Sequence, residues 1–401
     1  MLAGIQLGRE SDGPPPEPGS RAAQEPETTM TAIERVRAVL NGQRPDRPVV
    51  DLGGRVASLS TPAYLGLKRH MGLGHELESE TVTLLNTVGS LDEGILEAFD
   101  VPFRRLYVQA GSGFRLSRTA DGGFCDEWGV RYEPRGPYNE RVGHPLAEAS
   151  LADLDSFSWP DGADPARTAG LADRARALHE SRRVGLVAGH ISAGVFQDCW
   201  NLRGLQQFLE DCALDEEFAE ALLDRTLAFH LAVWDQFLAA VGPYVELVET
   251  ADDLGGQHGL LISPAMYRRL IKPRHAKLNA FLRERTEAPI LYHSCGSIEP
   301  VIDDLLEAGV DVLNPIQPLP GRMLPEDLAG RYGDRLVFHG GLDVQKLLIT
   351  GTPAQVRAHV HRYYRAFGTE RYIMAPANSV QAGTPPENIV AAYEAAAELN
   401  A

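Results

Sequence analysis

A histidine and a cysteine two residues apart form the sharpest chemical signal in the sequence. They lie in LYHSCG at positions 291–296, where an apolar run gives way to polar residues. Residues two apart on a strand face the same side, so His293 and Cys295 can point together. Zinc accepts both imidazole and thiolate ligands, and the pair therefore indicates a zinc site. Because two ligands do not make a site, a buried cysteine beside a hydrogen-bonded histidine is the simpler alternative.

Two adjacent aspartates follow another apolar run. Asp252 and Asp253 stand directly after a segment rich in β-branched residues. Paired carboxylates can orient a substrate, bind metal or transfer a proton, because each raises the pKa of the other. We assign both aspartates to catalysis. Taken singly, each is explained equally well as a helix or loop cap.

Polar residues stand at the ends of most other apolar runs. His339 and His190 could each bind metal, although a lone histidine is more often part of a core or rim. We assign His339 to catalysis. In WNLRG (200–204), Arg203 could bind a carboxylate or serve the structure alone. The residues that we assign to substrate binding are Asp51, Arg55, Arg203, Gln317 and Asn378.

The elements that must position these residues follow a repeating pattern. We predict strands over residues 48–52, 103–109, 184–190, 245–250, 289–294, 310–314, 336–340 and 372–375. Helix signals lie between them: Thr31 and Glu34 have capping-box spacing, and Ser263, Thr352 and Thr384 each precede a proline. Eight strands alternating with helices predict a (β/α)8 TIM barrel, with reactive groups at the carboxyl ends of its strands. A doubly wound sheet alternates in the same way, but no glycine-rich phosphate loop supports it.

Two segments stand outside this repeat. Residues 111–135 alternate around Asp121-Gly122-Gly123 and predict an inserted β-hairpin. Residues 1–30 are rich in proline, glutamate, glycine and serine, which predicts a disordered N-terminal tail. Met30 stands just before the first helix signal and is a candidate translation start. We therefore expect one barrel domain over residues 31–401.

Composition excludes several classes of partner. The chain has 55 acidic and 38 basic residues and a formal charge of -17, which disfavours nucleic acid and anionic membrane surfaces. No apolar run is long enough to span a bilayer. Four cysteines are too few for a disulfide framework at this length, so a reducing cytoplasm is expected.

Four segments resemble one known superfamily. Residues 251–275, 291–318, 338–348 and 375–396 resemble, in order, the uroporphyrinogen-decarboxylase-like superfamily. That superfamily includes methylcobalamin:coenzyme M methyltransferases and corrinoid-linked O-demethylases. The resemblance implies a single (β/α)8 barrel whose site lies at the carboxyl ends of the strands.

The same resemblance separates two branches. Decarboxylases carry an arginine-rich stretch after the first strand, whereas VDLGGRVASLST (50–61) keeps only Arg55. The methyltransferase branch binds zinc through His-x-Cys and a later cysteine, whose place is taken here by Ala377. Either oxygen ligands complete the zinc or the chain is a divergent member. The oxygen candidates are Glu249, Asp252, Asp253 and Asn378, of which we assign Glu249 to the metal.

The resemblance thus implies a zinc-dependent methyltransferase that acts on a small molecule. A carboxylate in place of a thiolate leaves zinc harder, which favours demethylation of an ether over methylation of a thiol. The methyl group would pass to or from a corrinoid that is free or carried by a separate protein. One alternative is cofactor-free decarboxylation through Arg55, Arg203 and Asp253. Another is a catalytically silent binding protein.

Overall fold

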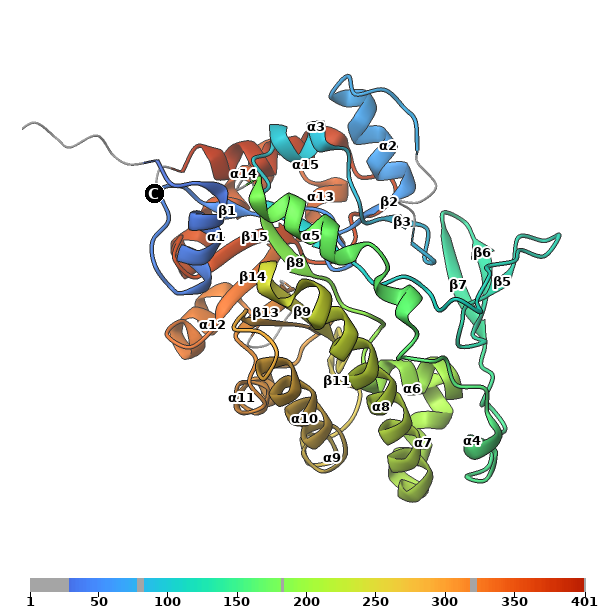
Figure 1. The fold of residues 1–401 in the computed structure, drawn as a ribbon. Coiled ribbons are helices and arrows are strands. Elements are labelled where there is room, and N and C mark those ends of the chain that lie inside the picture. The colour runs from blue at the N-terminus through green and yellow to red at the C-terminus, as the bar shows by residue number, and fades with distance from the viewer. Residues whose placement is uncertain (1–28, 78–82, 182–183, 318–322, 400–401) are drawn as a thin grey trace, which may run out of the picture.

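Eight parallel strands form the centre of the molecule (Figure 1). The computed structural model describes residues 29–77, 83–181, 184–317 and 323–399. Of the predicted tail over residues 1–30, residues 1–28 lie outside the described residues. The strands are β1 (Val49–Val50), β4 (Phe103–Leu106), β8 (Gly185–Ala188), β9 (Val245–Ala251), β12 (Ile290–His293), β13 (Val312–Ile316), β14 (Val337–Leu342) and β15 (Tyr372–Pro376). Every predicted strand is present.

The strands follow one another in the order of a barrel. The sheet runs β1-β15-β14-β13-β12-β9-β8-β4, so each strand pairs with its neighbours in the α/β repeat. Within the described residues no ladder joins β1 to β4. Instead, Arg105 of β4 forms an ion pair with Asp51, which directly follows β1. The structure is therefore a curled (β/α)8-type sheet, as predicted.

Helices cover the outside of this sheet (Figure 1). They are α1 (Ala32–Leu40), α2 (Thr61–His70), α3 (Glu93–Ala98), α4 (Asp153–Ser156), α5 (Leu171–Glu180), α6 (Val195–Arg203), α7 (Leu205–Leu214), α8 (Glu216–Val241), α9 (Pro264–Met266), α10 (Lys272–Arg283), α11 (Ile302–Glu307), α12 (Pro325–Tyr332), α13 (Leu347–Thr350), α14 (Pro353–Phe367) and α15 (Pro386–Ala397). A π-helical turn over Tyr267–Ile271 joins α9 to α10. None of the helices in the described residues has the length and apolar content that a membrane span needs.

Three of the four predicted helix caps are present. Thr31 forms a capping box with Glu34, Thr352 caps α14, and Ser263 accepts from the amide of Met266. The prediction for Thr384 is wrong, because α15 begins at Pro386 and Pro385 takes the cap position. A residue that precedes proline is restricted to extended backbone, so the second of two successive prolines opens the helix.

An apolar layer fills the amino-terminal end of the sheet interior. Each strand contributes one side chain to it: Val49, Phe103, Val187, Leu247, Leu291, Val312, Val337 and Ile373. Val36, Val39 and Leu40 of α1 pack against this layer. Because strand side chains alternate, the next interior positions lie two residues further along each strand. Those positions hold Asp51, Arg105, Gly189, Glu249, His293, Asn314, His339 and Ala375, and we call them the polar layer.

The insertion is larger than the predicted hairpin. It forms a three-stranded antiparallel sheet of β5 (Phe124–Cys125), β6 (Arg131–Arg135) and β7 (Tyr138–Gly143), which projects to one side in Figure 1. A turn does occur at Asp121-Gly122, but the main hairpin turns at Gly136. Sequence reasoning missed β7 because YNERVG has few apolar residues and is not buried on either face. Short pairs also form between β2 (Leu59–Ser60) and β3 (Thr87–Val88), and between β10 (Gly255–Gly256) and β11 (Gly259–Leu260).

The apolar layer predicts where truncation is most damaging. Leu291 is fully buried within it, and Leu291→Ala should lower the free energy of unfolding by about 2–5 kcal/mol. Leu214 is 86% exposed at the end of α7, so Leu214→Ala should change stability by less than about 0.5 kcal/mol. Urea denaturation measures both. Equal losses in the two variants would contradict the assignment of Leu291 to the core.

Candidate functional site

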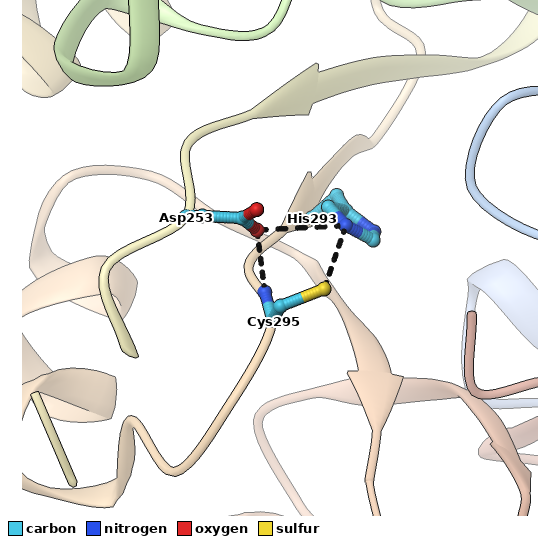
Figure 2. Close-up of side chains that lie close together, drawn as sticks. All are labelled: Asp253, His293 and Cys295. Atoms are coloured by element: carbon cyan, nitrogen blue, oxygen red, sulfur yellow. Dashed lines mark hydrogen bonds and ion pairs between the residues drawn. The ribbon is translucent and has the colours of Figure 1, made fainter. Parts of the chain in front are cut away.

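Asp253, His293 and Cys295 converge beyond the carboxyl ends of β9 and β12 (Figure 2). The Nε2 atom of His293 lies 3.5 Å from Cys295 Sγ and 3.7 Å from Asp253 Oδ1. The backbone amide of Cys295 donates to the same Asp253 oxygen at 2.8 Å. One nitrogen, one sulfur and one oxygen donor thus lie within 4.8 Å of one another, and all three residues are partly buried.

The thiol of Cys295 is in an unusual electrostatic environment. Burial raises its pKa well above the ordinary value, and the Asp253 carboxylate raises it further. In the opposite sense, the side-chain amide of Asn378 donates to Sγ at 3.0 Å. A divalent cation reverses such a shift, because a coordinating thiol is deprotonated.

Asp252 holds the loop that carries Asp253. Its carboxylate accepts from the backbone amides of Phe196 and Gln197 at the start of α6, and from His275 Nε2 at 2.7 Å. Burial raises the pKa of Asp252, and His275 partly offsets that effect. Gly194 permits the close approach, since a Cβ there would lie 2.0 Å from the Ala251 carbonyl oxygen. Asp252, which we predicted to be catalytic, is thus bound to α6 and α10.

The polar layer contains a buried ion pair that the sequence analysis did not assign. The Arg105 guanidinium binds both oxygens of Asp51 and donates from Nε to Glu249 at 2.7 Å. Burial alone would raise the pKa of Asp51, but Arg105 and His339 outweigh it and hold that pKa below its usual range. Glu249, the predicted metal ligand, therefore pairs with Arg105 and lies outside the cluster of His293 and its neighbours.

A hydrogen-bonded chain connects this ion pair to His293. Asp51 bonds His339 Nε2 at 2.9 Å, and His339 Nδ1 bonds the side-chain amide of Asn314 at 2.6 Å. The carbonyl oxygen of the same Asn314 side chain bonds His293 Nδ1. His339, predicted to be catalytic, is thus fully buried behind His293.

Gln317 and Ala377 bring two loops together near Cys295. Gln317 accepts from the amide of Gly296 at 2.9 Å and donates to the Ala377 carbonyl at 3.3 Å. Gly296 has a positive φ of 88°, and a Cβ there would meet the Gly255 backbone at 2.4 Å. Gln317 therefore supports the loop that presents Cys295.

Arg55 marks another part of the barrel mouth. It follows β1, is exposed, stacks over the Tyr107 ring at 4.6 Å and donates to the His190 carbonyl at 3.0 Å. Burial, followed by the charges of Arg55 and His293, lowers the pKa of His190 well below its usual value. The side chain of Arg55 is exposed, and its assignment to substrate binding stays a prediction.

Arg203 is the last residue of α6, and its side chain contacts other parts of the protein than Arg55 does. Its guanidinium binds Asp211 of α7 and the carbonyls of Leu146, Ala147 and Ala149, and it stacks on Phe218. Because Gly204 ends α6, Arg203 turns back onto α7 and the preceding loop. The structure thus gives Arg203 a set of internal partners, unlike Arg55.

Sequence reasoning did not assign Arg105 or Asn314 to the site. The positions of both residues nevertheless predict that their side chains face the barrel interior. Each lies two residues beyond an apolar-layer position, Phe103 and Val312, and so faces the interior. A charged or amide side chain at such a position requires a partner. His275, on α10, carried no comparable signal.

Comparison with known proteins identifies the family. Residues 142–399 match the family described as Uroporphyrinogen decarboxylase (URO-D). The chain belongs to the URO-D family. A comparison with curated proteins gives no match.

Three solved structures are similar to this chain to different degrees. A methyltransferase from Methanosarcina mazei is 18% identical with a TM-score of 0.62, covering 92% of this chain and 99% of its own. A putative vitamin-B12 independent methionine synthase from Listeria monocytogenes is 10% identical with a TM-score of 0.42, covering 88% and 98%. A B12-independent methionine synthase from Shewanella sp. W3-18-1 is 10% identical with a TM-score of 0.43, covering 86% and 96%. The first of these structures has the fold of this URO-D family member.

The buried ion pair predicts a pH-dependent penalty. Removing the guanidinium with Arg105→Met leaves Asp51 and Glu249 buried without their cation, which should cost about 3–5 kcal/mol at pH 8. In the wild type the pKa of Asp51 is lowered, so its contribution is complete above about pH 4 and is lost as pH falls below that value. In the variant, burial raises the pKa of Asp51, so acidification relieves the penalty.

Urea denaturation of both proteins at pH 8 and pH 5 measures this difference. The variant should be destabilised less at pH 5 than at pH 8. Arg131→Met is the control, because Arg131 is 47% exposed and its ion pair with Glu133 should contribute less than about 1 kcal/mol. A penalty of equal size at both pH values would show that Asp51 does not depend on Arg105.

Proposed function

We propose that this URO-D family member is a zinc-dependent methyltransferase that demethylates a small molecule. The convergence of Asp253, His293 and Cys295 carries the proposal. Zinc binds nitrogen, thiolate and carboxylate ligands, and a catalytic zinc site combines three protein ligands with one open position. These residues fit that pattern, with Asp253 in place of Glu249.

Within this proposal a different neighbouring group holds each ligand. The side-chain oxygen of Asn314 bonds His293 Nδ1, so Nε2 of the same ring faces the cluster. Asn378 contacts the sulfur of Cys295, and the backbone of Cys295 orients Asp253. When bound, zinc would supply Lewis acidity to the heteroatom that carries the methyl group. Arg55 would hold an anionic part of the substrate at the mouth.

The ligand set and the fold both support the transfer of a methyl group from an ether. A carboxylate in the place of a second thiolate keeps zinc harder, which suits an ether oxygen. The similarity to a solved methyltransferase from Methanosarcina mazei supports methyl transfer. We propose a corrinoid, free or carried by a separate protein, as the methyl acceptor. The four cysteines are free thiols, which supports a cytoplasmic location.

Decarboxylation is the second candidate, because the family is described by that activity. Asp253 and Arg55 both lie at the mouth, as that reaction requires. However, the guanidinium of Arg203, the other cation expected to bind carboxylates, is held by Asp211 and by backbone carbonyls. Loss of a charge-assisted contact weakens binding by about 1.5–3 kcal/mol, so this observation favours methyl transfer.

Metal content and turnover test the proposal together. The purified protein should hold about one zinc per chain, and Cys295→Ala should lose most of it. Cys212→Ala, which removes a buried thiol of α7, should keep it. With 2-methoxybenzoate, which carries a methyl ether and an anionic group, as the probe methyl donor, free cob(I)alamin should show the absorption change of methylation, and a zinc chelator should abolish it.

Two outcomes would contradict the proposal. Full zinc retention in Cys295→Ala would refute the metal site. Chelator-resistant release of carbon dioxide from uroporphyrinogen would establish the decarboxylase instead.

A further inference from the structure

Four residues of the polar layer form a chain of hydrogen bonds and ion pairs behind His293. In order they are Asn314, His339, Asp51 and Arg105, each from a different strand or strand end. Asp51, Asn314 and His339 are at most 1% exposed. These three side chains are therefore buried inside the barrel.

The direction of each hydrogen bond follows from Asp51. An ionised carboxylate only accepts, so Nε2 of His339 must donate to it. The side-chain NH2 group of Asn314, which only donates, lies 2.6 Å from His339 Nδ1, so that ring nitrogen accepts. A neutral imidazole with a proton on Nε2 has an acceptor at Nδ1.

The same side chain of Asn314 also contacts His293. With its NH2 group on His339 Nδ1, Asn314 presents its carbonyl oxygen to His293 Nδ1. The Nδ1 atom of His293 must then carry the proton and donate. The lone pair of His293 is thereby left on Nε2, the atom that faces Cys295 and Asp253.

We propose that Asn314, His339 and Asp51 are positioning residues that fix the tautomer of His293 and thereby set the metal affinity of the site. The inference rests on the proposed zinc function and extends it to residues that touch no ligand. Outer partners of metal-binding histidines fix the ring and typically contribute about 10–100-fold in affinity. A purely structural network would stabilise the fold without this effect on His293.

Zinc affinity of the purified protein, measured by competition with a colorimetric chelator, tests the positioning role. Asn314→Leu should weaken zinc binding about 10–100-fold, because His293 loses its acceptor. Asn314→Asp keeps an acceptor oxygen for His293 and should bind zinc at least as tightly as the wild type. His339→Leu should also weaken binding, because Asn314 loses the contact that fixes its orientation.

A matched control separates positioning from general destabilisation. His359 is another buried histidine, and its Nε2 contacts the Gly341 carbonyl outside the chain. His359→Leu should leave zinc affinity within a few-fold of the wild type. Wild-type affinity in Asn314→Leu, or equal losses in Asn314→Leu and Asn314→Asp, would overturn the proposal.

The tautomer itself is measurable without metal. Nitrogen-15 NMR of histidine-labelled, chelator-treated protein, with the His293 signals assigned by His293→Gln, should show a proton on Nδ1 and a lone pair on Nε2. In His339→Leu the two tautomers of His293 should mix. A proton on Nε2 in the wild type would overturn the inference whether or not zinc binds. The expected tautomer in a protein that binds no zinc would refute the proposed function and the effect on affinity, and confirm only the hydrogen-bond order.

Discussion

The polar interior of this barrel depends on the ion pairs of one buried guanidinium, that of Arg105. Arg105 of β4 pairs with Asp51, which directly follows β1, and with Glu249 of β9, which is two strands away in the sheet. Unpaired, either carboxylate would be strongly unfavourable in this environment. With Arg105 present, Asp51 stays ionised and supplies a fixed acceptor for His339. The orientation of Asn314 and of the His293 ring follows from that acceptor, so the candidate metal site depends on an ion pair that it does not contact.

The loops above the polar layer complete the site. Cys295 and Asp253 stand beyond the ends of β12 and β9, where strand hydrogen bonds no longer hold the chain. Asp252 ties the second loop to the start of α6, and Gln317 ties the first to the loop after β15. A buried polar side chain thus holds each loop: Asp252 precedes Asp253, and Gln317 bonds Gly296, which follows Cys295. Arg55, which bonds the His190 carbonyl, is an exposed cation at the same mouth.

The sequence predicted the eight strands because each is an apolar run that ends in a polar residue. It also predicted the pair of His293 and Cys295, since a two-residue spacing places both on one face. It did not separate Glu249 from Asp253 as the third candidate ligand, because both are carboxylates near the end of the same strand. The choice between these two carboxylates depends on Arg105 of β4, which forms an ion pair with Glu249 of β9. Such contacts between strands far apart in the sequence have no local signature.

The central claim is that zinc binds one sulfur, one imidazole nitrogen and one carboxylate oxygen of this chain. X-ray absorption at the zinc edge of the purified protein tests it most directly. The account predicts a single sulfur neighbour at about 2.3 Å and the remaining neighbours at about 2.0–2.2 Å, with the sulfur lost in Cys295→Ala. A first shell of nitrogen and oxygen alone in the wild type, or two sulfur neighbours, would contradict it.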